Sequence, residues 1–403
     1  MKKASAATPT WKTATAADGP RILVTAGETS GDLYAALLVA ALRRRLPAAT
    51  FFGCAGPRMR AAGVEPVVEA ESLAVVGLVE VVSHIPRIYR EFRKIVAEAR
   101  RRRPDLAILT DSPDFNLRLA GPLARLGVPV VYLVAPQVWA WRKGRLRSIR
   151  RHIRRLLCIF PFEEEFFRRH GVPALYIGHP LARLVRPTLS REDFLQKHRL
   201  PHDRPLVVLL PGSRPGEIRR HLAPLREAAE RLLQAQALSF VLALAPGTAL
   251  AADLRTFWEP FRPPAIQVIE GDTWNAIAHA DLALAASGTV TVEAALLGTP
   301  MVVFYRVSTL SWLLGRFLVD VPFYSMVNLI AGRQVVPELM QNEVSGESLA
   351  EHGRRLLADE EARRRMKADL AGVARALSGD QEPIEKAAAC VVELLPRGFP
   401  NVR

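Results

Sequence analysis

The 403-residue chain carries 55 Lys and Arg against 40 Asp and Glu, a formal net charge of +15 at pH 7, and 49% of its residues are hydrophobic. This hydrophobic content excludes a wholly disordered chain, and the length favours two domains over a single core. The positive charge favours an anionic partner, such as a nucleotide, nucleic acid or phospholipid headgroup, without choosing among them.

Residues 1–19 start with Met and two lysines but never reach the apolar run of a secretory signal, so we expect a flexible tail outside the fold. No apolar run of about eighteen residues follows, because the nearest candidate, 310–330, is interrupted by Arg316 and Asp320. The three cysteines are scattered without metal-ligand spacing, so we expect neither a disulfide framework nor a metal site. A reducing cytoplasm suits such a chain.

From Arg21 onward, short apolar runs alternate with amphipathic stretches, which indicates parallel strands with crossover helices. After a Pro-rich, charged stretch near 181–205, the alternation restarts with LVVLLPG. We therefore predict an α/β protein of two Rossmann-like doubly wound domains facing a central cleft, with ligands at the carboxyl ends of both sheets. The expected domains are 20–185 and 186–378, followed by a closing helix and tail over 379–403.

The loop after the first strand reads AGETSGD and opens directly into a helix, so its backbone N–H groups favour an anion. Glu28 and Ser30 are the candidate binding residues. A plain strand-to-helix turn, capped by Ser30 or Asp32, explains the glycines equally well but leaves Glu28 unexplained.

Asp111 and Asp114 follow the strand DLAILT, at the end of a strand where catalytic groups of open α/β sheets gather. A carboxylate there can take the proton from an attacking hydroxyl, which makes this pair the best candidate for a general base. Either residue alone is more typical of a turn or helix cap. The pattern does not decide which of the two is the base.

Arg142 follows Trp139 and Trp141 in a loop that suits sugar rings and phosphates. For the tryptophans, burial as structural anchors is the more common case. The basic clusters at 100–103 and 142–155 contain no nucleic-acid-reading motif, so we expect no nucleic-acid partner and favour a solvated face near anionic lipid.

In the second half, Gly212, Ser213 and Arg214 end a strand and precede a helix. Gly212 allows close backbone approach, and the Arg214 guanidinium suits a diphosphate. A routine turn with a surface arginine is the alternative.

Ser287, Gly288 and Thr289 join another strand to a helix whose N-terminus can hold phosphate, and Glu293, one turn inside, can accept from ribose hydroxyls. Thr289 and Glu293 also resemble a helix cap, and the two interpretations are compatible.

Two apolar segments could contact a bilayer, namely 75–82 with the amphipathic helix that follows it, and 310–318. In that helix Ile85, Phe92 and Ile95 share one face. For each segment, ordinary core packing is an equally good interpretation.

Taken in order, the motifs resemble those of the lipid A disaccharide synthase family, glycosyltransferases of the B architecture. The resemblance rests on AGETSGD (26–32), CAGPRM (54–59), PDFN (113–116), VWAWR (138–142), IGHP (177–180), LPGSR (210–214), ASGT (286–289) and NLIAGR (328–333).

The resemblance implies that UDP-2,3-diacylglucosamine donates its sugar to 2,3-diacylglucosamine 1-phosphate, giving a β-1,6-linked disaccharide 1-phosphate and UDP. It assigns Asp114 as the base, Arg214 as the cation near the nucleotide, Asn328 as a polar site residue and Gln381 as a residue near the nucleotide. The first domain then takes the acceptor and the second the UDP-sugar. The family acts at the cytoplasmic face of the inner membrane, tends to form a homodimer and uses no cofactor or metal.

Two other functions stay open from the sequence. A UDP-N-acetylglucosamine 2-epimerase is built on the same architecture, and a fold alone does not separate it from a transferase. A non-enzymatic basic protein that binds membranes is the second alternative.

Overall fold

The computed structural model describes residues 19–72, 78–244, 254, 266–308, 312 and 321–396, with the backbone alone over 78–84. Residues 1–18 of the expected tail lie outside the described residues. So do most of the two apolar segments proposed to contact lipid, except Trp312 and the backbone from 78 onward.

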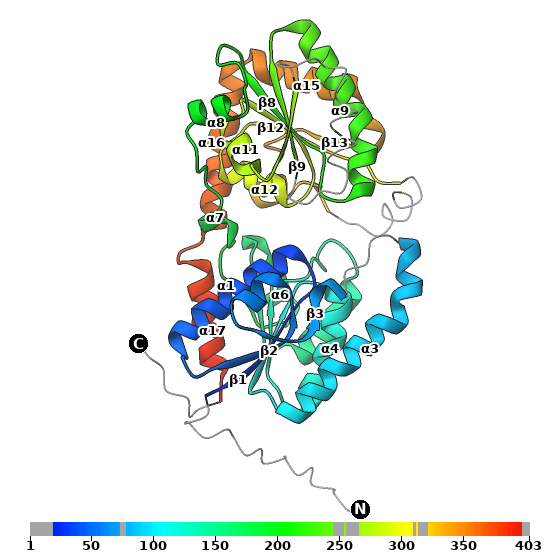
Figure 1. Ribbon diagram of the computed structural model, residues 1–403, viewed down its shortest axis with the longest axis vertical. Coiled ribbons are helices and arrows are strands. Elements are labelled where there is room, and N and C mark those ends of the chain that lie inside the picture. Colours follow the sequence, from blue (N-terminus) through cyan, green and yellow to red (C-terminus); the bar gives the residue numbers. More distant parts are fainter. Residues whose placement is uncertain are drawn as a thin grey trace, which may run out of the picture. The chain divides into compact units, whose positions relative to one another are not determined.

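The chain divides into two compact units, residues 1–178 with 380–403, and residues 179–379 (Figure 1). The first unit therefore includes the last helix of the chain. From the sequence we expected the corresponding boundaries after residues 185 and 378.

The first unit is built on a parallel seven-stranded sheet in the order β3-β2-β1-β4-β5-β6-β7. Its strands are β1 (Arg21–Ala26), β2 (Thr50–Ala55), β3 (Glu65–Glu69), β4 (Leu106–Thr110), β5 (Val130–Leu133), β6 (Arg155–Cys158) and β7 (Ala174–Tyr176). Its helices are α1 (Thr29–Arg45), α2 (Pro57–Ala61), α3 (Leu78–Arg102), α4 (Pro113–Arg125), α5 (Leu146–His152), α6 (Pro161–Arg169) and α17 (Pro383–Leu394), with short 3₁₀ turns η1 (Ala70–Ser72) and η2 (Lys143–Arg145).

Helices cover both faces of this sheet, with α1 and α17 on one side and α3 and α4 on the other (Figure 1). The central strands are therefore continuous apolar runs instead of alternating ones, as expected for a parallel sheet buried on both faces. Leu23 and Leu109 from the sheet pack with Ile95 of α3 and Leu119 of α4, and all four are fully buried.

The second unit contains a parallel six-stranded sheet in the order β10-β9-β8-β11-β12-β13. Its strands are β8 (Leu206–Leu210), β9 (Ser239–Leu244), β10 (Ile266–Glu270), β11 (Leu282–Ala286), β12 (Met301–Tyr305) and β13 (Glu338–Met340). The helices described here are α7 (Leu181–Leu184), α8 (Arg191–Lys197), α9 (Pro215–Ala235), α11 (Thr273–His279), α12 (Thr289–Leu296), α14 (Met326–Ala331), α15 (Gly346–Ala358) and α16 (Glu360–Ser378), with the 3₁₀ turn η3 (Gln341–Glu343).

Each sheet has a point where the order of strands along the chain reverses. In the first sheet this switch point lies between β1 and β4, and in the second it lies between β8 and β11. Ligands of doubly wound proteins bind beyond the carboxyl ends of the strands at such points. The loops after these four strands carry most of the site residues that the sequence analysis selected.

Candidate active site

Asp111, at the carboxyl end of β4, ties the loop after β4 to the loop after β1. Its Oδ1 accepts the backbone N–H of Gly27 at 3.0 Å, and its Oδ2 accepts that of Glu28 at 3.2 Å. Burial raises the pKa of the Asp111 carboxyl to about 7, although the N–H of Gly27 and the hydroxyl of Ser112 act against this shift. Asp111 therefore holds the two loops together at the switch point.

The glycines of the first loop leave space for Asp111 and its neighbour. A Cβ atom on Gly27 would lie 2.2 Å from Ser112 Oγ, and one on Gly31 would lie 1.5 Å from Asp111 Oδ2. Both distances are far below a van der Waals contact. These positions therefore need glycine for close packing of the two loops.

Asp32, the last residue of the same motif, caps α2 and not α1. Its carboxylate accepts the backbone N–H of Arg58 at 2.9 Å and of Met59 at 3.1 Å. Glu28 is the N-cap residue of α1 and makes no side-chain cap hydrogen bond. Glu28 and Ser30 are both exposed, so their side chains are the part of this loop that is open to a ligand.

Two buried polar side chains, Asn116 and Tyr132, donate hydrogen bonds to the backbone at Asp111. Asn116 Nδ2 donates to the carbonyls of Thr110 at 2.7 Å and Asp111 at 3.0 Å, while its Oδ1 accepts from Thr25 Oγ1 at 2.8 Å. Tyr132 Oη donates to the Asp111 carbonyl at 2.5 Å. Asp111 and Ser112 adopt positive φ angles, +51° and +39°, so these contacts stabilise a strained turn.

Asp114 lies in the first turn of α4 and is exposed, with 66% of its side chain accessible. Its Oδ1 forms ion pairs with Arg142, at 3.0 Å, and with Arg145. Both guanidinium groups also lie near the ring of Trp141, at 4.3 and 5.8 Å from its centroid. The structure thus brings Asp114 and Arg142 together and adds Arg145, which the sequence analysis did not select.

Trp139, in the loop that leads to Arg142, is anchored in the interior. Its Nε1 donates to Glu163 Oε1 at 3.1 Å, and Glu163 Oε2 accepts the backbone N–H of Phe160 at 3.2 Å. Glu163 is completely buried, and this burial raises the pKa of its carboxyl to about 8. Glu163 therefore fixes the loop that carries the arginines.

In the second unit, Arg214 is the N-cap residue of α9 and is 73% exposed. Its guanidinium pairs with Glu217 at 3.2 Å, and Glu217 Oε1 also accepts from Tyr305 Oη at 2.9 Å. Gly212 has a φ of +111°, a region that favours glycine, and Ser213 is exposed. The loop after β8 thus presents a hydroxyl and a guanidinium beside the start of a long helix.

His221 connects the loop after β8 to the end of β12. Its Nδ1 lies 2.7 Å from the Pro211 carbonyl, and its Nε2 accepts the backbone N–H of Arg306 at 3.1 Å. The ring is fully buried, and burial lowers the pKa of His221. The Pro211 carbonyl can only accept, which favours a proton on Nδ1, and burial favours the neutral ring.

Ser287 and Gly288 form the loop after β11, Gly288 is the N-cap residue of α12, and Thr289 is the first residue of that helix. Gly288 and Thr289 are exposed, and a Cβ atom on Gly288 would meet open space. Glu293 is one turn inside α12, where burial raises the pKa of its carboxyl to about 7 against a hydrogen bond from Trp274. The start of α12 is therefore open to a ligand, while the Glu293 side chain is largely buried.

Asn328 is completely buried, and its amide group is fully used by the protein. Its Nδ2 donates to the Val336 carbonyl at 2.9 Å and to Glu338 Oε1 at 2.7 Å. Its Oδ1 accepts the backbone N–H groups of Val335 at 2.7 Å and Val336 at 3.0 Å. Asn328 therefore positions the segment that leads into β13.

The contacts of Asn328 continue to the loop after β11. Glu338 accepts the backbone N–H groups of Tyr324 and Ser325, both at 2.9 Å. The Tyr324 carbonyl in turn accepts from Ser287 Oγ at 3.1 Å. Asn328 is thus connected to Ser287 through one carboxylate and one backbone segment.

Gln381 is exposed and precedes α17, in the part of the chain that belongs to the first unit. Among the described residues, no group of three or more His, Cys, Asp or Glu side chains is placed to hold a metal ion. In the same part of the chain, no helix combines the length and apolarity needed to cross a bilayer.

Comparison with solved structures identifies the fold. The chain is similar to a putative UDP-N-acetylglucosamine 2-epimerase from Listeria monocytogenes, with a TM-score of 0.63 and 15% identity, covering 95% of this chain and 99% of that one. It is also similar to CalG4, the calicheamicin glycosyltransferase, with a TM-score of 0.56 and 17% identity, covering 94% and 99%. The fold is that of glycosyltransferases of the B architecture and these epimerases, which confirms the predicted fold class.

Sequence comparison identifies the family, within the proteins that share this fold. Residues 22–393 match the family described as "LpxB: Lipid-A-disaccharide synthetase". A lipid-A-disaccharide synthase of Solibacter usitatus is 62% identical over 93% of this chain and 98% of its own, and one of Myxococcus xanthus is 46% identical over 94% and 98%. The chain belongs to the lipid-A-disaccharide synthetase family and is a glycosyltransferase of lipid A biosynthesis with lipid-A-disaccharide synthase activity.

Proposed function

We propose that the chain transfers the sugar of UDP-2,3-diacylglucosamine to the 6-hydroxyl of 2,3-diacylglucosamine 1-phosphate, with Asp114 as the general base. The observation that carries this assignment is an exposed carboxylate at the β1/β4 switch point, flanked by two arginines. The acceptor oxygen attacks the anomeric carbon, the bond from that carbon to UDP breaks, and its electron pair leaves with UDP. The proton of the hydroxyl goes to Asp114, and the configuration inverts.

The structure supports Asp114 over Asp111 as the base. Both carboxylate oxygens of Asp111 accept backbone N–H groups. Gly31 packs so closely against this carboxylate that a Cβ atom on Gly31 would lie 1.5 Å from Oδ2. Asp114 is exposed to solvent, and its side chain pairs with the guanidinium groups of Arg142 and Arg145. A base must reach the proton that it removes, which favours the exposed carboxylate.

Arg142 and Arg145 are suited to the phosphate of the acceptor. Guanidinium groups bind phosphate in a bidentate manner, and a dianionic phosphate attracts them more strongly than one carboxylate. Binding of the acceptor phosphate would draw Arg142 away from Asp114. The carboxylate is then free to accept the proton from the 6-hydroxyl. Glu28 and Ser30 line the same edge of the sheet.

The UDP-sugar belongs to the second unit in this proposal. Three groups supply hydrogen-bond donors to the diphosphate as its charge develops. They are the guanidinium of Arg214, the backbone around Gly212 and Ser213, and the N-terminus of α12 at 287–289. Glu293 accepts from the ribose hydroxyls, and Gln381 contacts the nucleotide. Asn328 acts through Glu338 to hold the backbone that accepts from Ser287, so it is a positioning residue.

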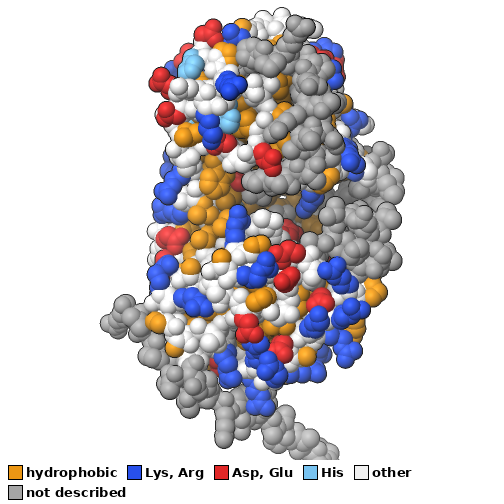
Figure 2. Space-filling model, viewed as in Figure 1, with side chains coloured by type: hydrophobic (Ala, Val, Ile, Leu, Met, Phe, Trp, Pro, Cys, Tyr) orange, Lys and Arg blue, Asp and Glu red, His pale blue; other side chains and the backbone are white. Residues whose placement is uncertain are grey.

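A position at the cytoplasmic face of the inner membrane follows from the acylated substrates and is supported by the surface of α3. Ile85 and Tyr89 are 54% and 59% exposed, beside the exposed Arg87 and Arg90. Lys and Arg side chains gather over the part of the first unit that contains α3 (Figure 2). An apolar side chain next to cations suits an anionic bilayer surface. A homodimer and the absence of a cofactor complete the proposal.

The test is sugar transfer by the purified protein from UDP-2,3-diacylglucosamine to 2,3-diacylglucosamine 1-phosphate in detergent, with EDTA present. We expect equal amounts of disaccharide 1-phosphate and UDP. Release of UDP in the absence of the acylated acceptor would favour the epimerase alternative instead. Salt-sensitive membrane binding without affinity for UDP would favour the non-enzymatic alternative.

A further inference from the structure

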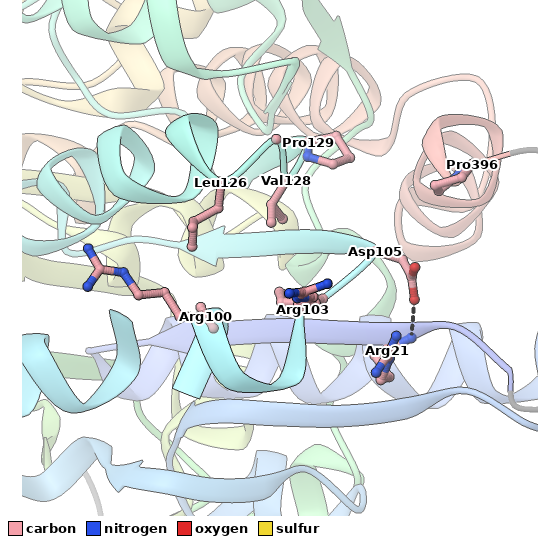
Figure 3. Close-up of a pocket in the computed structure, with 11 residues that line it drawn as sticks. Arg21, Arg100, Arg103, Asp105, Leu126, Val128, Pro129 and Pro396 are labelled. Atoms are coloured by element: carbon pink, nitrogen blue, oxygen red, sulfur yellow. Dashed lines mark hydrogen bonds between the residues drawn. The ribbon is translucent and has the colours of Figure 1, made fainter. Parts of the chain in front are cut away.

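A cavity of about 330 Å³ opens at the amino-terminal edge of the first unit's sheet (Figure 3). It lies between the carboxyl end of α3, the α4–β5 loop and Pro396, which follows α17. The loops around Asp111 and Asp114 are at the opposite, carboxyl edge of the same sheet. A strand of five residues spans about 17 Å, so this cavity is separate from the candidate active site.

One wall of the cavity is apolar and the other is cationic (Figure 3). Leu126, Val128 and Pro129 form the apolar wall. Arg21 and Arg103 lie on the opposite side, with Asp105 as the one carboxylate among the residues that line the cavity. The balance of charge thus favours an anion, and the apolar wall favours a ligand with a hydrocarbon part.

Arg21 is the residue that points most clearly to a ligand. Its backbone N–H donates to Asp105 Oδ2, and its carbonyl accepts the backbone N–H of Asp105, both at 2.8 Å. Its side-chain Nε is buried and has no hydrogen-bond partner in the described part of the chain. A buried donor without a partner is uncommon in folded proteins and is unfavourable unless an acceptor reaches it.

We propose that this cavity binds an amphiphilic anion, a carboxylate or phosphate monoester that carries a short apolar chain. The anionic group would accept from Arg21 and lie near Arg103, while the chain would pack against Leu126 and Val128. A cavity of about 150 Å³ can hold benzene, so a cavity of about 330 Å³ has room for an anionic group with a short chain. Hexyl phosphate matches this size and serves as the probe.

The first measurement is titration calorimetry of hexyl phosphate into the full-length protein, with inorganic phosphate and hexanol as half-ligands. We expect saturable binding of hexyl phosphate and binding at least about tenfold weaker for each half-ligand, because each lacks one of the two interactions. Saturating UDP should not displace the probe. Absence of saturable binding, or displacement by UDP, would overturn the proposal.

Variants then locate the site. Arg21→Gln removes the guanidinium, and Leu126→Glu places a carboxylate in the apolar wall, so each should weaken binding by about tenfold or more. Arg101→Gln is the matched control, since Arg101 belongs to the same end of α3, pairs with Glu98 and is not among the residues that line the cavity. Unchanged transferase activity shows that each variant is folded. An equal loss in Arg101→Gln and Arg21→Gln would contradict a defined pocket.

One further arm identifies the source of the ligand. Competition by phosphatidylglycerol vesicles would assign the natural ligand to a membrane lipid, whereas its absence would assign it to a free anion. Both outcomes support the cavity as the binding site.

Discussion

Replacing Gly31 by alanine tests the close packing of the two loops at the β1/β4 switch point. In a helix, alanine is normally more stable than glycine by about 0.5–1 kcal/mol. At this position the added Cβ would lie 1.5 Å from Asp111 Oδ2 and 3.3 Å from Asp111 Cβ. Overpacking of this kind costs about 1–3 kcal/mol, so the clash outweighs the helical preference. We expect the free energy of unfolding to fall by about 1–2 kcal/mol.

The same substitution should reduce turnover, because Asp111 must move. Its displacement also shifts Asp114, which lies shortly after it in the first turn of α4. A displacement of about 1 Å at a reacting group can lower kcat about 100-fold. Affinity for UDP should stay unchanged, since Arg214 and the N-terminus of α12, which bind the diphosphate in the proposal, are in the second unit.

Urea unfolding and steady-state kinetics check both effects, with Gly372→Ala as the matched control. Gly372 is inside α16, and the nearest atom to an added Cβ would be Arg375 Nη2 at 3.8 Å. This control should be more stable than the wild type by about 0.5–1 kcal/mol. A Gly31→Ala variant as stable and as active as the control would refute the reasoning.

Three further predictions concern other parts of the structure. Asn328→Ala removes an amide with four hydrogen bonds and should lower the free energy of unfolding by about 2–4 kcal/mol in thermal melts; a loss below about 0.5 kcal/mol would contradict its positioning role. Arg214→Gln should raise KM for the UDP-sugar about tenfold or more, and an unchanged KM would exclude Arg214 from the nucleotide site. Glu163→Gln should change how stability depends on pH, measured by urea unfolding between pH 4 and 9.

The direction of the Glu163 effect follows from its pKa, which burial raises from the ordinary 4.5 to about 8. Between these values the folded protein keeps a proton that the unfolded chain has released, so rising pH favours unfolding. The stabilisation present below pH 4.5 is therefore lost up to about pH 8, with a slope of at most about 1.4 kcal/mol per pH unit. Glu163→Gln should lack this slope, and parallel curves for the two proteins would contradict the shifted pKa.

The strands and the loops that follow them were predictable because a buried parallel strand is a continuous apolar run in the sequence. The predicted strand DLAILT contains β4, and the run LVVLLPG, where the alternation restarts, contains β8. Asp111, Asp114, Arg214 and 287–289 were found in the same way, since each directly follows such a strand. Local sequence is sufficient for features of this kind.

Residues that act through distant partners were not predictable. His221 is inside a helix, and only the folded chain shows that it connects Pro211 to Arg306, 85 residues away from it. The sequence gives no sign that Glu163 reaches back to Trp139. Asn328 was selected by resemblance as a site residue, whereas its contacts show a buried amide that supports the loop at Ser287.

The central claim is that Asp114 removes the proton from the acceptor, and single-turnover transfer by Asp114→Asn tests it most directly. Loss of a general base lowers the rate by about 10²–10⁴-fold, and we expect a loss of that size with affinity for UDP unchanged. Glu192→Gln, which changes an exposed carboxylate in the first turn of α8, is the matched control and should keep full activity. A rate for Asp114→Asn within about tenfold of the wild type, below the usual contribution of a general base, would contradict the account.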